Sequence, residues 1–121
     1  MNGVLIIAHG SRAKEAELTM QAIAELVEAK LQGCLLRLAY NEFSDQTIEA
    51  GIDDLVARGA DNIMAIPYFL FSGMHVRNDI SQKLGACAER HPGTPIVLGE
   101  ALGVDERLAD IVLDRIQEIQ P

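Results

Sequence analysis

The sequence has few of the residues that mark disulfide-rich, zinc-binding or membrane proteins. It contains two cysteines and no tryptophan, and aromatic residues make up 4% of its 121 positions. Two isolated cysteines without a Cys-x-x-Cys pair predict neither a disulfide framework nor a zinc or redox site. Because Cys34 and Cys87 lie in segments of apolar periodicity, we expect both to be buried structural thiols.

Basic residues are also in short supply. The chain has 10 Lys and Arg against 18 Asp and Glu, which gives a net charge of −8. The resulting field opposes extended contact with nucleic acid or an anionic membrane. No apolar run is long enough to span a bilayer, and the start at Met1 lacks the basic region of a signal peptide. We therefore expect a cytoplasmic protein with neither a nucleic acid nor a membrane as its partner.

The chain does contain a regular alternation of short apolar runs and helical stripes. At this length we expect a single domain of residues 1–121. The apolar runs predict strands, and apolar spacings of three and four predict helices between and after them. The predicted strands cover residues 4–8, 34–40, 63–66 and 95–98, and the helices lie near residues 16–31, 48–56, 80–87 and 105–119, the last with Asp105 as its N-cap.

This order predicts an α/β fold built as a single (βα)4 lobe. Strands that are apolar on both faces and joined by crossover helices indicate a parallel sheet with helices on both faces. We expect a flavodoxin-like arrangement in which the four strands follow the order 2-1-3-4. The first and third strands would then meet at the switch point, where such sheets bind ligands.

Polar residues that suit metal and proton chemistry follow the predicted strands. His9 and His75 come after the first and third strands, Glu42 follows the second, and Glu100, the least secure member, follows the fourth. Imidazole is the commonest protein metal ligand, and carboxylate adds an oxygen donor for divalent cations. The set lacks a local signature such as His-Glu-x-x-His, so each residue also has a structural explanation. The shared position of the two histidines favours function.

Residues 9–12, His-Gly-Ser-Arg, match neither a P-loop, a dinucleotide fingerprint nor a serine-hydrolase elbow. Ser11 is explained by helix capping at least as well as by catalysis. Since helix N-termini attract anions, Ser11, Arg12 and Arg77 are candidates for holding carboxylates of a substrate.

The aromatic segment 67–71, Pro-Tyr-Phe-Leu-Phe, precedes His75 directly. Most of its side chains are expected to complete a buried strand, whereas Phe71 and Met74, nearest the histidine, are candidates to line an apolar cleft. We expect Gly73 to relieve crowding of the backbone beside them.

Three motifs together resemble the class II tetrapyrrole chelatases, in particular the short CbiX-type sirohydrochlorin cobaltochelatases. They are Ala-His-Gly-Ser-Arg at 8–12, Ala-Tyr-Asn-Glu at 39–42, and Pro-Tyr-Phe-Leu-Phe-Ser-Gly-Met-His at 67–75 followed by Asp79 and Ile80. The resemblance covers essentially the whole chain, and the third motif is its most specific part.

The resemblance implies an enzyme that inserts a divalent metal into sirohydrochlorin without ATP or another nucleotide. The metal would be Co²⁺ first, with Fe²⁺ or Ni²⁺ as alternatives, on the way to cobalamin or siroheme. It assigns metal binding and catalysis to His9, His75 and Glu42. From the positions described above, we expect substrate binding by Ser11, Arg12, Phe71, Gly73, Met74 and Arg77.

Larger members of that family contain two such lobes across one cleft, so the resemblance also implies a symmetric homodimer. Two other interpretations stay open at this point. One is a flavodoxin-like module that holds or delivers metal or tetrapyrrole without turnover, and the other is a regulatory domain in which the histidines are dispensable.

Overall fold

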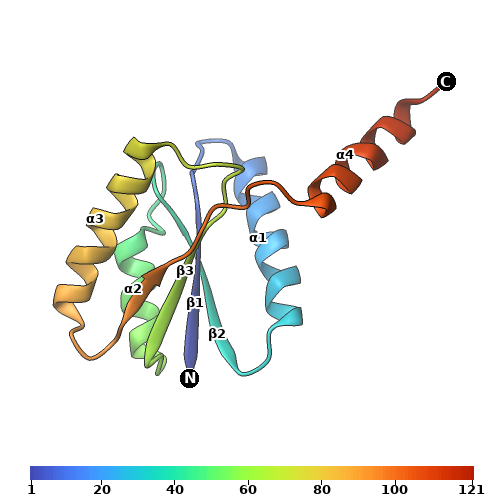
Figure 1. Ribbon diagram of the computed structural model, residues 1–121. Coiled ribbons are helices and arrows are strands. Elements are labelled where there is room, and N and C mark those ends of the chain that lie inside the picture. The colour runs from blue at the N-terminus through green and yellow to red at the C-terminus, as the bar shows by residue number, and fades with distance from the viewer.

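Four strands alternate with four helices along the chain, as the apolar pattern predicts (Figure 1). The computed structural model describes residues 1–121. In chain order the elements are β1 (Asn2–Ala8), α1 (Lys14–Lys30), β2 (Cys34–Tyr40), α2 (Ile48–Ala57), β3 (Asn62–Pro67), α3 (Met74–Arg90), β4 (Ile96–Leu98) and α4 (Glu106–Ile119).

The four strands form one parallel sheet in the order β2-β1-β3-β4, which confirms the predicted topology. β1 lies in the middle and pairs with both β2 and β3. β4 pairs with β3 over three residues only and forms one edge. Since all strands run the same way, the segments that follow them gather at one end of the sheet.

The continuous apolar run of β1 arises because both faces of this strand are covered. Leu5 and Ile7 lie in a core cluster with buried residues of α2 and α3, whereas Val4 and Ile6 lie in a second cluster under α1. Side chains alternate between the faces of a strand, so a strand buried on both sides has no polar positions. The core is therefore two apolar layers with the sheet between them.

The helices do not cover the two faces equally. α2 and α3 pack on one face, and α1 packs on the β1–β2 half of the other (Figure 1). α4 packs on neither face but projects away from the sheet, and none of its residues is buried. The apolar pattern of this helix was predicted correctly, and Asp105 is its N-cap, accepting a hydrogen bond from the Arg107 amide at 2.9 Å.

The outward course of α4 begins in the segment after β4. The amides of Leu102 and Gly103 donate to the carbonyls of Phe69 and Leu70 at 2.9 and 2.8 Å. Gly103 has a φ of +66°, in the left-handed region that favours glycine. These bonds tie the β4–α4 segment to the loop after β3, and α4 starts from that fixed point.

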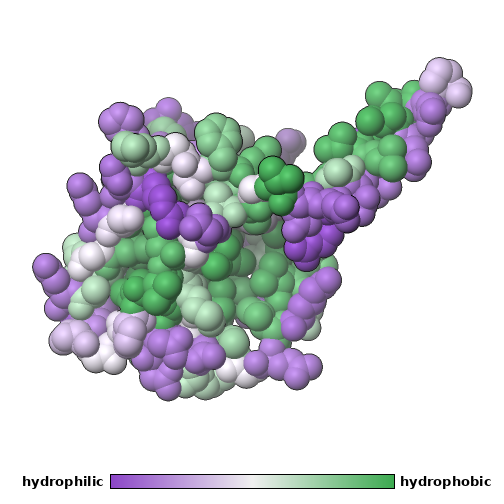
Figure 2. Space-filling model, viewed as in Figure 1, coloured by the Kyte–Doolittle hydropathy of each residue, from purple (hydrophilic) through white to green (hydrophobic).

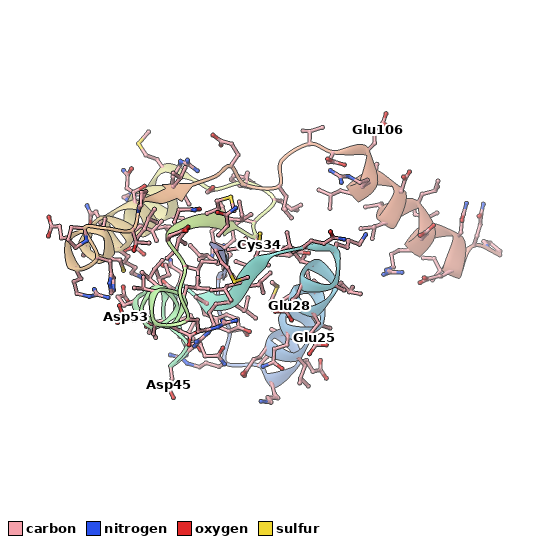
Figure 3. The ribbon with its side chains drawn as sticks, turned by 90° about the horizontal axis from the view of Figure 1, so that it is seen from below. Glu25, Glu28, Cys34, Asp45, Asp53 and Glu106 are labelled. Atoms are coloured by element: carbon pink, nitrogen blue, oxygen red, sulfur yellow. The ribbon has the colours of Figure 1, made fainter.

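The two cysteines differ from each other. Cys87 on α3 is fully buried, as predicted, and both cysteines are free. Cys34 is only half-buried, so the expectation of two buried thiols is wrong for this residue. It is the first residue of β2, at the end of the sheet opposite the carboxyl ends of the strands, and it packs against the edge of the core cluster under α1 (Figure 3).

The length and hydropathy of the helices bear on the question of a membrane segment. None of the four helices combines the length and the apolar character needed to cross a bilayer.

Candidate functional site

The carboxyl ends of the strands gather the residues singled out from the sequence. His9 directly follows β1, Glu42 follows β2, and His75 is the second residue of α3, which follows β3. All three side chains are exposed at this edge, as is Glu100 after β4. The folding of the sheet thus brings residues that are far apart in sequence to one edge of the molecule.

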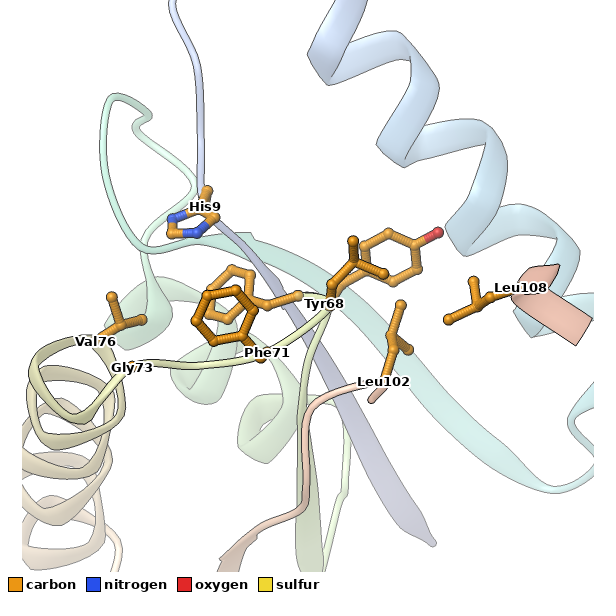
Figure 4. A pocket seen from close by; sticks show the side chains of 9 residues that line it. His9, Tyr68, Phe71, Gly73, Val76, Leu102 and Leu108 are labelled. Carbon is orange, nitrogen blue, oxygen red and sulfur yellow. The ribbon is translucent and has the colours of Figure 1, made fainter. Parts of the chain in front are cut away.

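The largest pocket of the molecule opens at this edge and has a volume of about 530 Å³ (Figure 4). That size lies within the range of pockets that bind small molecules. Seven of its nine lining residues are hydrophobic. The lining residues are His9, Tyr68, Phe69, Leu70, Phe71, Gly73, Val76, Leu102 and Leu108. An open, apolar pocket with one imidazole at its wall suits a flat apolar ligand.

The His9 ring is held by an aromatic neighbour. Its centroid lies 4.1 Å from that of the Phe69 ring, at an interplanar angle of 32°. Phe69 is buried in the core, so the ring that orients His9 is itself fixed by packing. His9 also borders a smaller pocket of about 190 Å³ between the loop after β1 and α1, which Tyr40 and Tyr68 line. The imidazole therefore lies between two hollows.

Tyr40, which lines this smaller pocket, has a neutral phenol. Burial, with a lesser contribution from the Glu17 carboxylate, raises the pKa of its phenol. The phenol remains protonated at neutral pH and donates a hydrogen bond to the Glu17 carbonyl at 3.5 Å. This end of β2 is thus tied to α1.

The loops after β1 and β2 touch directly. The Glu42 amide donates to the His9 carbonyl at 3.0 Å, and Gly10 has a φ of +95°. A Cβ at Gly10 would overlap the carbonyl oxygen of Glu42. Only glycine meets both demands, the left-handed backbone and the missing side chain. Gly10 therefore fixes the backbone of His9 against that of Glu42.

A polar cluster ties the loop after β2 to α3. Lys83 donates to the side-chain oxygen and the carbonyl of Asn41 at 2.8 and 3.0 Å, and Asn41 donates to Asp79 at 3.1 Å. Lys83 and Asp79 also form an ion pair of 3.3 Å, so each of the three residues contacts the other two. Since Glu42 follows Asn41 and His75 begins α3, this cluster sets the position of one candidate residue relative to the other.

His75 lies beside the large pocket without lining it. Its neighbours Gly73 and Val76 are part of the wall. Gly73 is the N-cap of α3 with a φ of −65°, and a Cβ there would meet no atom within 4 Å. The expectation that Gly73 relieves crowding is therefore wrong, since any residue would fit its backbone and surroundings.

The edge of one chain does not form a finished metal centre. No three His, Cys, Asp or Glu side chains lie close enough together to hold a metal ion. His9, His75 and Glu42 share the edge but do not form such a group. A metal ion at this edge would need further donors from another molecule.

Two arginines at the site are left without a carboxylate partner. Among the chain's 10 lysines and arginines, only Arg12, Lys30 and Arg77 form no ion pair. The Arg12 guanidinium lies 4.5 Å above the Phe43 ring, and Arg77 donates to the Gly99 carbonyl at 3.3 Å. In a chain of net charge −8, unpaired arginines at one edge are available for an anionic group.

Ser11 is explained by the local backbone. Its hydroxyl accepts a hydrogen bond from the Ala13 amide at 3.0 Å, which forms a turn before α1. The residue at the N-cap of α1 is Ala13, which has no capping side chain. Ser11 thus shapes the loop that carries His9.

Part of the pocket wall was not predicted from the sequence. Phe71 lines it as expected, whereas Met74, also expected there, is exposed outside it. Leu102 and Leu108 were missed, although Leu102 follows the last strand and so had to reach the same edge. Tyr68 was assigned to the buried strand, yet it lines both pockets.

Comparison with known proteins assigns this arrangement to a family. The family model described as CbiX matches residues 3–119. The chain belongs to the CbiX family. Similarity to single CbiX-family proteins extends over nearly the whole chain. A sirohydrochlorin cobaltochelatase of Sulfurisphaera tokodaii is 32% identical over 98% of this chain and 94% of its own length.

Other CbiX-related proteins are about twice as long. A sirohydrochlorin ferrochelatase of Priestia megaterium is 34% identical over 98% of this chain, which spans only 44% of that protein. The crystal structure of the sirohydrochlorin chelatase SirB from Bacillus subtilis subspecies spizizenii in complex with cobalt has a TM-score of 0.91 at 30% identity. It matches 98% of this chain and 50% of its own.

Proposed function

We propose that the protein inserts a divalent metal into sirohydrochlorin without ATP. The observation that carries the proposal is the position of His9 on the wall of an open apolar pocket of about 530 Å³, in a chain that the CbiX family model matches over residues 3–119. An apolar wall suits the face of a macrocycle, and the imidazole borders the space that the macrocycle would occupy. The metal is the second substrate.

Metal insertion requires two kinds of chemistry at that face. Water must leave the metal ion, and two pyrrole N–H protons must leave the macrocycle. A neutral imidazole can replace water as a metal ligand, or it can accept a pyrrole proton as a base. We assign these tasks to His9 and His75, with Glu42 assisting in metal capture or proton removal. The macrocycle's nitrogens would supply the donors that the chain alone lacks.

The remaining residues of the edge would bind the macrocycle. Phe71 and Gly73 line the pocket, and Met74 adds an exposed apolar side chain next to His75. Arg12 and Arg77, which have no carboxylate partner in the chain, would pair with carboxylates of the substrate. Ser11 would shape the loop that carries His9, and its hydroxyl would contact the substrate.

For the metal we propose Co²⁺ first, then Fe²⁺, with Ni²⁺ as a further possibility. The order of the metals is supported by the lengths of the related proteins. The Sulfurisphaera protein named as a cobaltochelatase matches this chain over 94% of its length, and the Priestia protein named as a ferrochelatase over 44%.

We also propose that the active form is a homodimer in which each copy supplies one domain of residues 1–121. The chain corresponds to half of the SirB chain, so a second copy would supply the other half of the cleft. We propose a cytoplasmic location, to which the two free cysteines are suited, since reducing compartments keep thiols reduced.

The test is an anaerobic absorbance assay of the purified protein with sirohydrochlorin and Co²⁺, Fe²⁺ or Ni²⁺ separately. Each metal is run against a reaction without enzyme and against the variant His9→Ala/His75→Ala. The matched control is His91→Ala, which removes the third histidine at the opposite end of α3. We expect acceleration with Co²⁺, unchanged by His91→Ala and lost in the double variant.

Other results would overturn parts of the proposal. A spectral change on binding without acceleration of metal insertion would make the protein a carrier. Acceleration that survives the double variant would remove the histidines from the chemistry. If neither binding nor acceleration occurs, sirohydrochlorin is not the substrate.

A further inference from the structure

Phe43 is the one residue other than glycine whose backbone lies in the left-handed region, with a φ of +58°. The Cβ of an L-residue is crowded in this region, a steric cost that glycine does not have. A bulky aromatic residue at such a φ is therefore an outlier. Strained residues of this kind cluster at functional sites. Phe43 directly follows Glu42, so the outlier lies at the carboxyl edge of the sheet.

The loop that carries Phe43 is held on both sides of this residue. Before it, the Glu42 amide donates to the His9 carbonyl at 3.0 Å. After it, the Gln46 carbonyl accepts a hydrogen bond from the Tyr40 amide at 2.8 Å, which closes the loop at its base. A strained backbone persists only where the surrounding structure holds it in this way. The backbone of Phe43 is therefore fixed between two bonded positions.

Burial of the ring does not explain this conformation. Phe43 is 54% exposed and belongs to neither core cluster. Figure 2 shows apolar residues among polar ones at the surface of this edge, along the upper side of the body. The Arg12 guanidinium lies over the ring, with its carbon 4.5 Å from the centroid. The strained loop thus brings the ring to the loop after β1 rather than into the core.

Stacking on an aromatic face leaves the donors of a guanidinium free. Its N–H groups point outward in the plane of the group, whereas the ring contacts one face of that plane. Arg12 pairs with no carboxylate of its own chain, so these donors remain available. An arginine held in this way presents two parallel N–H groups, the geometry that a carboxylate accepts.

Acidic residues of the chain itself could compete for Arg12. Phe43 lines a hollow of about 410 Å³ together with Glu17 and Asp45, and Arg12 does not line it. A guanidinium that was free to turn could form an ion pair with either carboxylate and would then be lost to a ligand. Contact with the ring keeps Arg12 unpaired although two acidic residues lie beside its aromatic partner.

We infer that Phe43 is a positioning residue, which holds the Arg12 guanidinium in the orientation that binds a peripheral carboxylate of the macrocycle. The inference rests on the proposed function, in which a macrocycle with carboxylates binds at this edge. It adds a residue that the sequence did not single out. Phe43 does not touch the reacting atoms, and its strained backbone is what brings the ring under Arg12.

The first test measures binding of metal-free sirohydrochlorin by absorbance titration, so no turnover is needed. Removal of the ring by Phe43→Leu should raise the dissociation constant about two- to fivefold, the size of one exposed cation–π contact. Phe43→Tyr keeps an aromatic face and should bind as the natural chain does. Both variants keep a side chain on the strained backbone, so the comparison isolates the ring.

A double-mutant cycle shows whether Phe43 acts through Arg12. We expect Arg12→Ala to raise the dissociation constant by about tenfold or more, because a charge-assisted bond to a carboxylate is lost. Phe43→Leu should add nothing in the Arg12→Ala background. The matched control is Lys30→Ala, which removes an unpaired positive charge at the far end of α1 and should leave binding unchanged. An equal effect of Phe43→Leu with and without Arg12 would overturn the inference.

Thermal unfolding separates this role from a structural one. Glycine adopts the left-handed backbone without strain, so Phe43→Gly should melt a few degrees above Phe43→Leu, although both lack the ring. Its affinity for the macrocycle should nevertheless stay below that of the natural chain. If Phe43→Gly melts well below the natural chain and still binds as tightly, the ring is structural and the inference is wrong.

Steady-state rates of metal insertion give a further readout. Phe43→Leu and Arg12→Ala should raise KM and leave kcat unchanged, because the interaction that they remove binds the ground state and the transition state alike. A fall in kcat at constant KM would assign these residues to the chemistry and would contradict a positioning role.

The proposed function and this inference can fail separately. Binding that depends on Phe43 and Arg12, in a chain that inserts no metal, would leave the inference standing and remove the reaction. Metal insertion with a dissociation constant that ignores both residues would do the reverse. A natural chain that binds no macrocycle would overturn both.

Discussion

The buried layer of the sheet and its carboxyl edge differ in almost every respect, although they belong to the same strands. Leu5 and His9 are four residues apart in one continuous segment, yet Leu5 is fully buried and His9 is exposed. Below the edge, apolar side chains fill both faces of the sheet; at the edge, histidine, carboxylate and arginine side chains face outward. The buried layer therefore stabilises the fold, and the edge carries the residues that we propose for the chemistry.

α3 shows the same division along one helix. It begins with Met74 and His75 at the edge and ends with His91 at the opposite end. Between them Ile80, Leu84 and Cys87 are buried against the sheet. The two histidines are alike in kind but differ in position, and that difference can be tested directly.

Replacement of His75 should have the largest effect on function. We expect His75→Ala to lower the rate of metal insertion by at least about 100-fold, the size of a lost general base. Its unfolding free energy should change by less than about 0.5 kcal/mol, since an exposed residue adds little to the core. Rates from the absorbance assay and urea unfolding measure the two.

His91→Ala is the matched control for this change. His91 pairs with Asp53 at 2.7 Å, far from the edge, so its replacement should leave the rate of metal insertion unchanged. Equal losses of rate in the two variants would break the division between edge and body.

Truncation of a buried leucine should have the opposite result. Leu55 of α2 is 0% exposed and Leu26 of α1 is 65% exposed. We expect Leu55→Ala to lower the unfolding free energy by about 2–5 kcal/mol through lost burial and the cavity left behind. Leu26→Ala should cost less than about 1 kcal/mol. Urea unfolding measures both, and similar costs for the two would contradict the assignment of the core.

Gly10→Ala lies on the boundary between the two regions. A side chain there meets the Glu42 carbonyl and a left-handed backbone, so we expect a loss of about 1–3 kcal/mol of unfolding free energy together with reduced metal insertion. Gly85→Ala, in open space within α3, should stabilise the protein by about 0.5–1 kcal/mol. A Gly10→Ala variant with normal rate and stability would show that the two loops move independently.

The smallest effect concerns pH and lies far from the edge. Hydrogen bonds from His91 and then from Arg90 lower the pKa of Asp53. A carboxyl whose pKa is depressed by folding adds stability above its unfolded pKa, and this is lost as pH falls through the lower, folded value. As pH falls from about 5 to about 3, the unfolding free energy of the natural chain should therefore decrease more steeply than that of Asp53→Asn. Urea unfolding at each pH measures both. Parallel curves would mean that these bonds contribute nothing.

The topology could be predicted because the central strand, β1, is buried on both faces. Continuous apolar runs such as residues 4–8 occur where helices cover both sides, and a parallel order with right-handed crossovers leaves few arrangements. The order 2-1-3-4 and the shared edge for His9 and His75 followed from that.

The course of α4 could not be predicted in the same way. Periodicity shows which side of a helix is apolar but not which surface it meets. The course depends on two backbone hydrogen bonds after β4, and backbone bonds leave no pattern in the residue types. For the same reason Leu108 was missed as part of the pocket wall. The expectation that Gly73 relieves crowding failed for a different reason, because a glycine beside a site does not by itself indicate a crowded backbone.

The backbone of the edge continues the hydrogen-bond pattern of the sheet beyond the strands. The amides of Asn41 and Glu42 donate to the carbonyls of Ala8 and His9, and the amide of Leu102 donates to the carbonyl of Phe69. Displacement of one of these segments would break bonds in line with the sheet itself. The side chains of the edge are thus exposed to solvent, whereas its backbone is held by hydrogen bonds. We therefore expect a preorganised site, in which a ligand would find the proposed reacting groups already in position without the entropic cost of ordering a loop.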